Sequence, residues 1–217
     1  MRRIFVTAFA LLATFLTVNA QVFVGGSLGL NLGGGKNSSY NSEGSGYGFG
    51  FNISPQVGYY LNNDLAIGVR VSLDNNWSNN KATYPDEPTY DRVSKSFRNY
   101  WGIHFFGRYK LIELGIENLS LLAEGLIGVQ GSSNKQTENE ITTKYPGATV
   151  YSINARPVLS YKLSDRLDVL AYCDFLTIGY NYQTQKGSLF DQKSKYHSFN
   201  LGFNSFSDLS IGFLYKF

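Results

Sequence analysis

Few residues in this chain have side chains suited to catalysis or ligand binding, and the first of the two histidines stands among charged neighbours. His104 shares one parity of an alternating segment with Arg108, and Arg70 and Glu124 occupy the equivalent parity of neighbouring segments. A histidine beside a carboxylate can act as a general base. We favour a different interpretation, a self-neutralising network inside a narrow barrel, because charges removed from water must be paired. The residues assigned to this lumen network are Arg70, His104, Arg108, Glu124, Arg156 and Asp174.

His197 is the second candidate, near the outer end of the last segment, where an enzyme that modifies lipids would carry a catalytic histidine. Its nearest serine of the same parity farther along the strand is Ser205, about 26 Å away at the rise of a β-strand. This spacing gives no His–Ser dyad. Ser198 is adjacent in sequence, so a lipid-modifying enzyme stays as an alternative to our expectation that the protein is not an enzyme.

Metal and cofactor sites are not indicated. Cys173 is the only cysteine, and it lies on a different segment from either histidine, so no spacing of metal ligands appears. The glycine clusters at 33–35 and 44–50 are not followed by the Lys-Ser/Thr of a phosphate-binding loop. We therefore expect no cofactor and no metal.

The N-terminus has the pattern of a secretory signal peptide. Arg2 and Arg3 precede an apolar run over 4–18 that ends near Ala20, and this run is shorter than the ~20 residues of a spanning helix. We expect residues 1–20 to be cleaved and 21–217 to form one domain. Removing Arg2 and Arg3 leaves 17 of the 19 basic residues against 16 acidic ones, a net charge of +1. That balance gives no basic surface for nucleic acid.

Period-2 alternation recurs along the rest of the chain, which is typical of strands with one apolar face. The expected strands are 22–32, 47–61, 65–74, 97–110, 119–130, 149–163, 167–176 and a last one that reaches the C-terminus. Short connections over 62–64, 112–118 and 164–166 alternate with long polar ones, which we expect to be loops over 33–46, 75–96, 131–148 and 177–196. The sequence therefore predicts an all-β, eight-stranded antiparallel up-and-down barrel.

The composition of the two faces indicates that the apolar one meets lipid. The polar face is rich in Gly, Ser and Asn and carries charges of both signs, which suits a narrow lumen. The apolar face is almost free of charge and has aromatic residues toward the segment ends, as in the girdles of transmembrane barrels. A secreted β-sandwich is the alternative.

The last eight residues, 210–217, carry a resemblance. Ser210, Gly212, Tyr215 and Phe217 match the C-terminal signal of bacterial outer-membrane barrels. The chain resembles the small barrel family that includes OmpX and the barrel half of OmpA, in the form common in Bacteroidota. The resemblance implies an outer-membrane location, contact with outer-membrane lipid and lipopolysaccharide, and insertion by the barrel assembly machinery, which would recognise these C-terminal residues.

The expected function is a monomeric, non-enzymatic surface protein that supports the envelope. The aromatic residues of the long connections, such as Trp77 and Tyr145, either form an adhesive surface for an external ligand or fold onto the rim. A narrow conduit for small solutes is the second hypothesis, and the lipid-modifying enzyme is the third.

Overall fold

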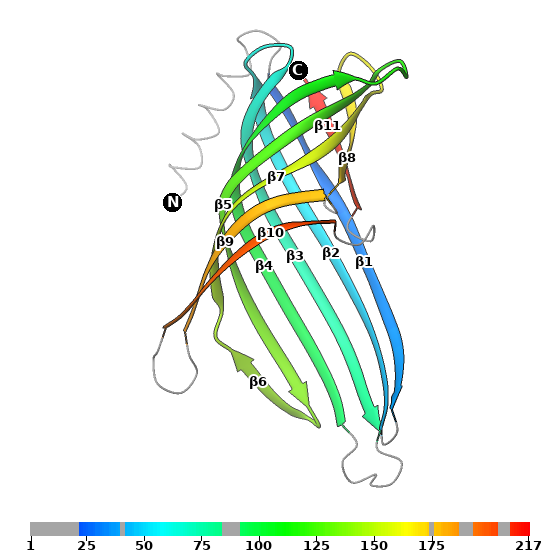
Figure 1. Ribbon diagram of the computed structural model, residues 1–217, viewed down its shortest axis with the longest axis vertical. Helices are drawn as coiled ribbons and strands as arrows, with labels where there is room; N and C mark the ends of the chain where they lie inside the picture. The colour runs from blue at the N-terminus through cyan, green and yellow to red at the C-terminus, as the bar shows by residue number, and fades with distance from the viewer. Residues whose placement is uncertain (1–21, 40–41, 84–91, 174–175, 187–192, 204–208) are drawn as a thin grey trace, which may run out of the picture.

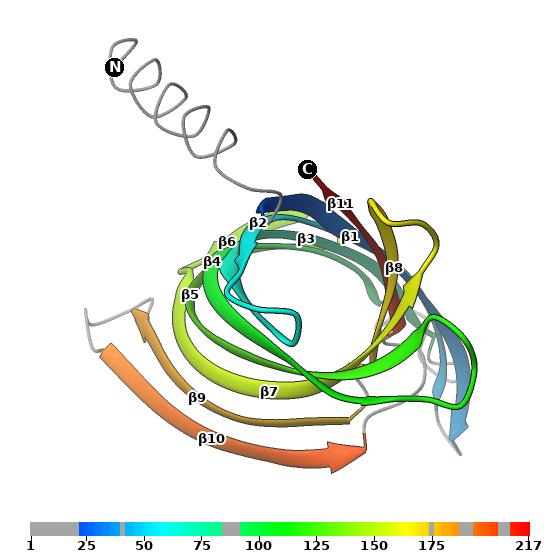
Figure 2. The same cartoon turned by 90° about the horizontal axis from the view of Figure 1, so that it is seen from above.

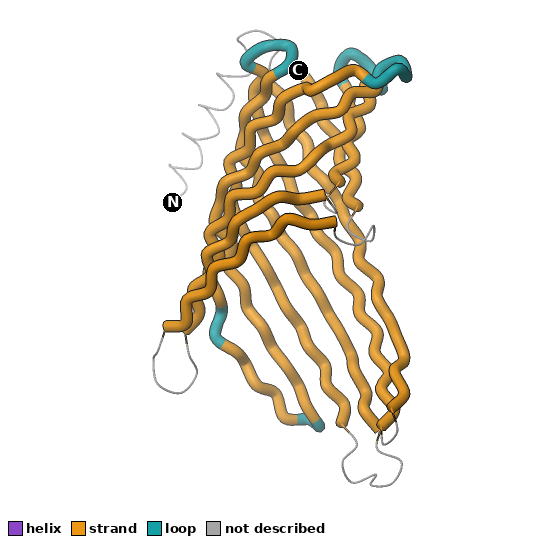
Figure 3. Tube along the Cα trace, in the orientation of Figure 1, coloured by secondary structure: helices purple, strands orange, loops and turns teal. Residues whose placement is uncertain are grey.

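The computed structural model describes residues 22–39, 42–83, 92–173, 176–186, 193–203 and 209–217. Regular structure in these ranges is entirely β, in one antiparallel sheet (Figures 1 and 3). Among the described residues, no helix has the length and hydropathy needed to cross a membrane. Asp174, Ser205 and the expected signal peptide lie outside the described residues.

Eleven strands are formed within these ranges. They are β1 (Val22–Ser39), β2 (Ser42–Tyr60), β3 (Leu65–Thr83), β4 (Arg92–Glu113), β5 (Leu119–Glu138), β6 (Ile141–Tyr145), β7 (Ala148–Lys162), β8 (Leu167–Cys173), β9 (Leu176–Lys186), β10 (Lys193–Phe203) and β11 (Leu209–Lys216).

Eight of the strands close into a ring, which confirms the predicted barrel. The order around the ring is β1, β2, β3, β4, β5, β7, β8 and β11. The last strand pairs with the first from Phe23 opposite Lys216 to Leu28 opposite Ile211. Figure 2 shows the ring from its turn end, with β9 and β10 outside it.

The other three strands extend the wall on the loop side. β6 pairs with the end of β5, β9 pairs with β7 beyond β8, and β10 pairs with β9. Within the described ranges, β1 pairs beyond Leu28 only with β2, and β10 pairs only with β9. The wall is therefore closed near the turns, and the sheet opens between β1 and β10 farther out.

The prediction of four long polar loops is wrong, because most of their residues belong to strands. β1 and β2 remain paired from Val22 opposite Tyr59 to Ser39 opposite Ser42, and β3 pairs with β4 up to Ala82 opposite Arg92. Polar Asn, Ser and Gly side chains do not prevent the backbone ladder, whose hydrogen bonds are independent of side-chain polarity. At 33, 75 and 131 the apolar alternation gives way to polar residues while the strands continue. This change thus marks where a strand leaves the apolar part of the wall.

The predicted short turns at 62–64 and 164–166 are confirmed, and each contains a side-chain contact that stabilises it. Asn62 Oδ1 accepts hydrogen bonds from the amides of Asp64 (2.9 Å) and Leu65 (2.8 Å), an Asx arrangement. At the other turn, Lys162 Nζ lies 2.7 Å from Asp165 Oδ1, and this hydrogen bond lowers the pKa of the Asp165 carboxyl. The predicted connection at 112–118 is shorter, because β4 continues to Glu113.

The two faces of the wall have the predicted orientation. Leu28, Leu30 and Leu32 are 60, 67 and 75% exposed on the outside of β1, whereas Phe23 and Ser27 of the same strand are buried. An apolar core packs inside the closed ring, with Phe23, Phe106, Val158, Leu170 and Leu214 at most 3% exposed. Exposed apolar groups on a closed wall are typical of a surface solvated by lipid.

The aromatic core leaves no room at Gly68, and this generates a prediction. A Cβ on Gly68 would lie 2.5 Å from the Phe106 ring, whereas a Cβ on Gly107 would meet nothing within 4 Å. We expect Gly68→Val to lower the free energy of unfolding by about 1–3 kcal/mol through overpacking. This change is measured by urea titration of the protein in lipid vesicles, with the folded fraction at each urea concentration read from its heat-modifiable migration on gels. Gly107→Ala is the control, and equal destabilisation by both variants would contradict the core packing.

Candidate functional site: an ion cluster across the lumen

Glu124 lies at the centre of the lumen and is fully buried. Its carboxylate accepts hydrogen bonds from three guanidiniums on three strands: Arg70 of β3, Arg108 of β4 and Arg156 of β7. The Nη2–oxygen distances are 2.7 Å for Arg70, 2.5 Å for Arg108 and 2.8 Å for Arg156. The structure therefore brings four of the six predicted lumen residues into one cluster.

The register of the sheet puts these side chains together. Arg108 lies directly opposite Glu124 across the β4–β5 ladder, and Arg156 lies opposite Glu124 across the β5–β7 ladder. Arg70 reaches over from β3 and binds both carboxylate oxygens, with Nη1 2.9 Å from Oε1. Because alternate residues of each strand point inward, a shift of one residue in any of these ladders would break the cluster.

Gln56 and Tyr172 complete the hydrogen bonding around the arginines. Gln56 Oε1 accepts from Arg70 Nη2 (2.8 Å), and Gln56 Nε2 donates to the Tyr172 hydroxyl (3.0 Å). The hydroxyl also accepts from the Nη2 atoms of Arg70 and Arg108, each at 3.3 Å. Sequence reasoning placed both residues on the polar face and did not assign them to the network. The signal available in the sequence was the alternation itself, which gives both residues the parity of the inward-facing side chains.

Aromatic rings cover the arginines on the turn side. The Arg156 guanidinium carbon lies 4.4 Å from the centre of the Tyr172 ring, and that of Arg108 lies 5.1 Å from the centre of Phe106. Within the described part of the chain, Arg108 Nε and Nη1 have no hydrogen-bond partner. The ring face offers these buried donors a negative quadrupole, so the cation–π contact partly replaces hydrogen bonds.

Of the remaining two predicted residues, His104 stands apart from this cluster. His104 is buried on the lumen face next to it, and its Nδ1 is 3.1 Å from Ser72 Oγ. Its hydrogen-bond partner is therefore the Ser72 hydroxyl rather than Glu124. The predicted Asp174 lies outside the described residues. Nearer the turns, Lys216 Nζ lies 2.7 Å from Asp168 Oδ2, a second ion pair, which borders the turn-side end of the lumen.

The cluster separates two chambers. The turn-side chamber has about 790 Å³ and is bordered by Arg108, Asp168 and Lys216. The loop-side chamber has about 670 Å³ and is bordered by Arg70, His104 and Arg156. Because the side chains of Glu124, Arg70 and Arg108 are at most 4% exposed, the layer between the chambers is packed.

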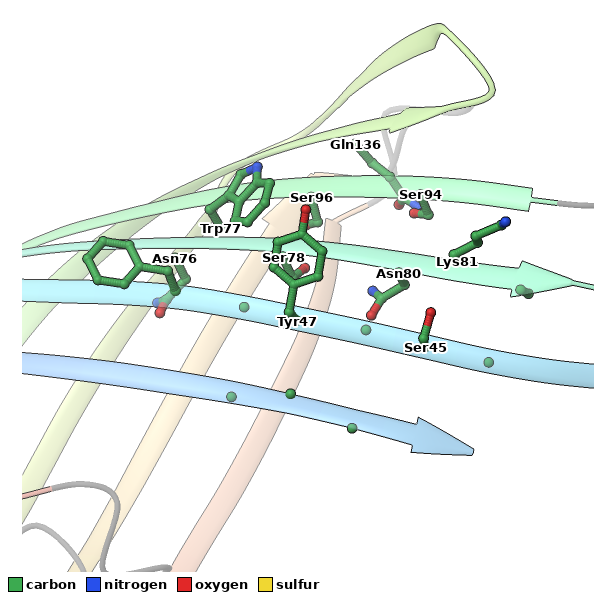
Figure 4. A pocket seen from close by; sticks show the side chains of 18 of the residues that line it. Ser45, Tyr47, Asn76, Trp77, Ser78, Asn80, Lys81, Ser94, Ser96 and Gln136 are labelled. Atoms are coloured by element: carbon green, nitrogen blue, oxygen red, sulfur yellow. The ribbon is translucent and has the colours of Figure 1, made fainter. Parts of the chain in front are cut away.

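A third hollow of about 990 Å³ lies at the extended strand ends, where Tyr47, Trp77 and Lys81 line it together with asparagine, serine and glycine residues (Figure 4). Asparagine side chains lie over the glycines that face them across the ladder. Gly46 pairs with Asn80 and Gly50 with Asn76, and a Cβ on either glycine would overlap the facing amide oxygen. The same arrangement recurs where Gly179 faces Asn154. These pairs keep the inner wall thin and polar.

The C-terminal residues are integrated into the closing seam. Ser210 and Gly212 are buried, and a Cβ on Gly212 would lie 2.8 Å from Gly26 O of β1. Tyr215 and Phe217 point outward and form an edge-to-face pair with ring centres 5.2 Å apart. The Phe217 amide donates to Val22 O at 3.1 Å. The seam therefore needs glycine at 212 and presents two aromatic rings to lipid.

His197 has aromatic neighbours in the structure. Its Nδ1 is 2.6 Å from the Tyr180 hydroxyl, and its ring centre is 4.9 Å from that of Tyr182. The side chain is exposed on the outer face of β10. Within the described ranges, no group of three or more His, Cys, Asp or Glu side chains is placed to hold a metal ion.

The central carboxylate yields a stability prediction. Glu124→Ala leaves three buried guanidiniums without the carboxylate that they share, so we expect the free energy of unfolding to fall by about 3–5 kcal/mol. Urea unfolding in vesicles measures the change. Glu138→Ala is the control, since its 3.6 Å ion pair with Arg92 is exposed to solvent and should contribute less than about 1 kcal/mol. Equal losses in the two variants would show that the lumen cluster has no special role.

Comparison with known proteins finds likeness of fold alone. No protein-family model matches the chain, and no curated protein matches it. Among solved structures, Neisserial surface protein A is 14% identical, with TM-score 0.39 over 90% of this chain and 97% of that one. Ail, the attachment invasion locus protein of Yersinia pestis, is also 14% identical, with TM-score 0.39 over 92% and 100%. The outer membrane protease OmpT from Escherichia coli is 9% identical, with TM-score 0.37 over 91% and 97%.

The fold itself rests on the geometry of this chain. Its eight-stranded ring closes between β11 and β1, its outer wall is apolar, and its lumen holds a buried ion cluster. These three features together make the chain a small β-barrel of the bacterial outer-membrane type.

Proposed function

We propose that this outer-membrane barrel is a non-enzymatic envelope protein with a sealed lumen, which acts through its folded wall and through the strands that extend on the loop side. The observation that supports this most is the Glu124 cluster. It spans the lumen from β3 to β7 and leaves Glu124 fully buried. A barrel with such a layer is suited to a structural or contact role, because ions would have to displace buried, paired charges to pass.

The conduit hypothesis has less support from the same geometry. A pore needs a continuous water path, and the two chambers on the barrel axis meet at side chains that are at most 14% exposed. Phe106 and Tyr172 of the apolar core pack against Arg108 and Arg156 and add to this layer. These contacts favour the sealed state over the conduit.

The enzyme hypothesis would place its catalytic group at His197. The partner at hydrogen-bond distance there is the Tyr180 hydroxyl, and the pair stands on the lipid-facing side of β9 and β10. Among the described residues, no carboxylate orients His197. This arrangement favours an interfacial aromatic cluster.

The proposed partners follow from the two ends of the wall. The exposed Tyr215 and Phe217 rings, with the tightly packed Gly212, are the groups that the barrel assembly machinery would read. The outer face contacts outer-membrane lipid. Because the ring closes on itself near the turns, a second copy is not needed to complete the wall, and we propose a monomer.

A planar-bilayer recording tests the sealed lumen. We expect the purified mature protein to insert without steady current at 100 mV, because the buried Arg–Glu layer blocks the axis. Insertion is checked separately by protease protection of the reconstituted barrel, so that silence is not confused with failure to insert. A steady open-channel current from protected protein would overturn the proposal and favour the conduit.

A further inference from the structure

Tyr180 of β9 and His197 of β10 form a close pair on strands that lie outside the closed ring (Figure 2). The Tyr180 hydroxyl lies 2.6 Å from His197 Nδ1. Tyr180 is 43% exposed and His197 is exposed as well, so the pair is open to the surroundings of the wall. An imidazole nitrogen can accept the proton of a neighbouring hydroxyl. A phenolate oxygen is in turn a ligand for haem iron.

An apolar hollow of about 660 Å³ lies on the outer wall beside Tyr180. Phe105 and Ile127 line it, and they are 63% and 55% exposed. The hollow also borders Gly107 and Gly125, which face each other across the β4–β5 ladder, and a Cβ on either glycine would meet nothing within 4 Å. Sites for small molecules typically have volumes of about 300–1,000 Å³, so this hollow is large enough for one.

The side chains on the loop side of the hollow change from aromatic to polar. Tyr151 faces Tyr182 across the β7–β9 ladder, and Tyr182 faces His197 across the β9–β10 ladder. The ring centre of Tyr182 lies 6.1 Å from that of Tyr151 and 4.9 Å from that of His197. In the next outward-facing row, Thr184 faces the exposed Lys195. A ligand in this place meets apolar groups at one edge, aromatic rings in the middle and a cation at the other edge.

We propose that this surface binds a ferric porphyrin, with Tyr180 as the axial ligand of the iron. The phenol proton passes to His197 Nδ1, and the phenolate oxygen replaces a water or hydroxide ligand on the iron. The porphyrin brings four nitrogen ligands of its own, so a single protein ligand is sufficient. Tyr180 and His197 are 17 residues apart and meet through the β9–β10 register, which is why no local spacing of metal ligands indicates the site.

The chemistry of the surface fits a planar amphipathic ring. Phe199 and Ile153 flank Tyr180 in its row and are 68% and 58% exposed, so they offer contact to the apolar edge of a porphyrin. The rings of Tyr151 and Tyr182 offer faces for stacking. Porphyrin carboxylates at the opposite edge would reach the level of Lys195. The inference rests on the outer-membrane placement and is independent of whether the lumen is sealed.

Titration of the mature protein in lipid vesicles with haemin tests the inference, and metal-free protoporphyrin IX is the second probe. We expect saturable haemin binding above the uptake of empty vesicles, with the absorption spectrum of phenolate-ligated ferric haem. The metal-free ring should bind at least about tenfold more weakly, because the iron–oxygen bond is missing.

Three variants separate the parts of the site. His197→Gln removes the proton acceptor and should weaken haemin binding roughly 10- to 100-fold, and Tyr180→Phe should weaken it at least as much. Tyr180→Phe should also abolish the phenolate spectrum. Lys195→Gln should weaken binding about two- to fivefold, as expected for one exposed charge pair.

Tyr161→Phe is the matched control, because Tyr161 is another outward-facing phenol and is 41% exposed. It should change haemin affinity less than about twofold. Heat-modifiable migration establishes that all variants fold. Haemin uptake no greater than that of empty vesicles, equal affinity for the metal-free ring, or an unchanged spectrum in Tyr180→Phe would each overturn the proposal. An equal loss in Tyr161→Phe would also overturn it, by showing non-specific adsorption to exposed tyrosines.

Discussion

The interaction on which the rest of this barrel depends is the sharing of one buried carboxylate by three guanidiniums. Glu124 is fully buried and binds Arg70, Arg108 and Arg156 from three strands. Taking these ions out of water has a large cost, which only short, well-oriented contacts offset. The cluster therefore fixes the register of β3, β4, β5 and β7 and fills the lumen with the same side chains.

The lumen is graded along its axis, and each layer meets a different physical need. Aromatic and aliphatic side chains pack against the ion cluster inside the closed ring, and a thin wall of Gly–Asn pairs follows toward the loop side. On the outside the order runs from leucine and isoleucine through an aromatic row to the polar strand ends. Along the lumen and along the outer wall alike, polar residues lie at the extended strand ends. The two surfaces therefore indicate the same orientation of the barrel in the membrane.

Much of this was predictable from the sequence, since side-chain period fixes which residues face inward. Alternation gave the faces of β1 to β5 and placed Arg70, Arg108, Glu124 and Arg156 on one side. It did not show where strands end: polar residues at 33–46 and 75–96 look like loops, although the backbone ladder continues to Ser39 opposite Ser42 and to Ala82 opposite Arg92. The roles of Gln56 and Tyr172 depend on cross-strand geometry over 116 residues of separation, which no local pattern contains.

Accessibility of the lumen from one side tests the central claim most directly. In a Cys173→Ser background, single cysteines at Asn52, which borders the loop-side chamber, and at Ser160, which borders the turn-side chamber, are exposed on intact cells to a membrane-impermeant thiol reagent. The sealed cluster predicts labelling at position 52 and none at position 160 until the outer membrane is permeabilised. Equally fast labelling at both positions on intact cells would show that the Arg–Glu layer does not close the barrel.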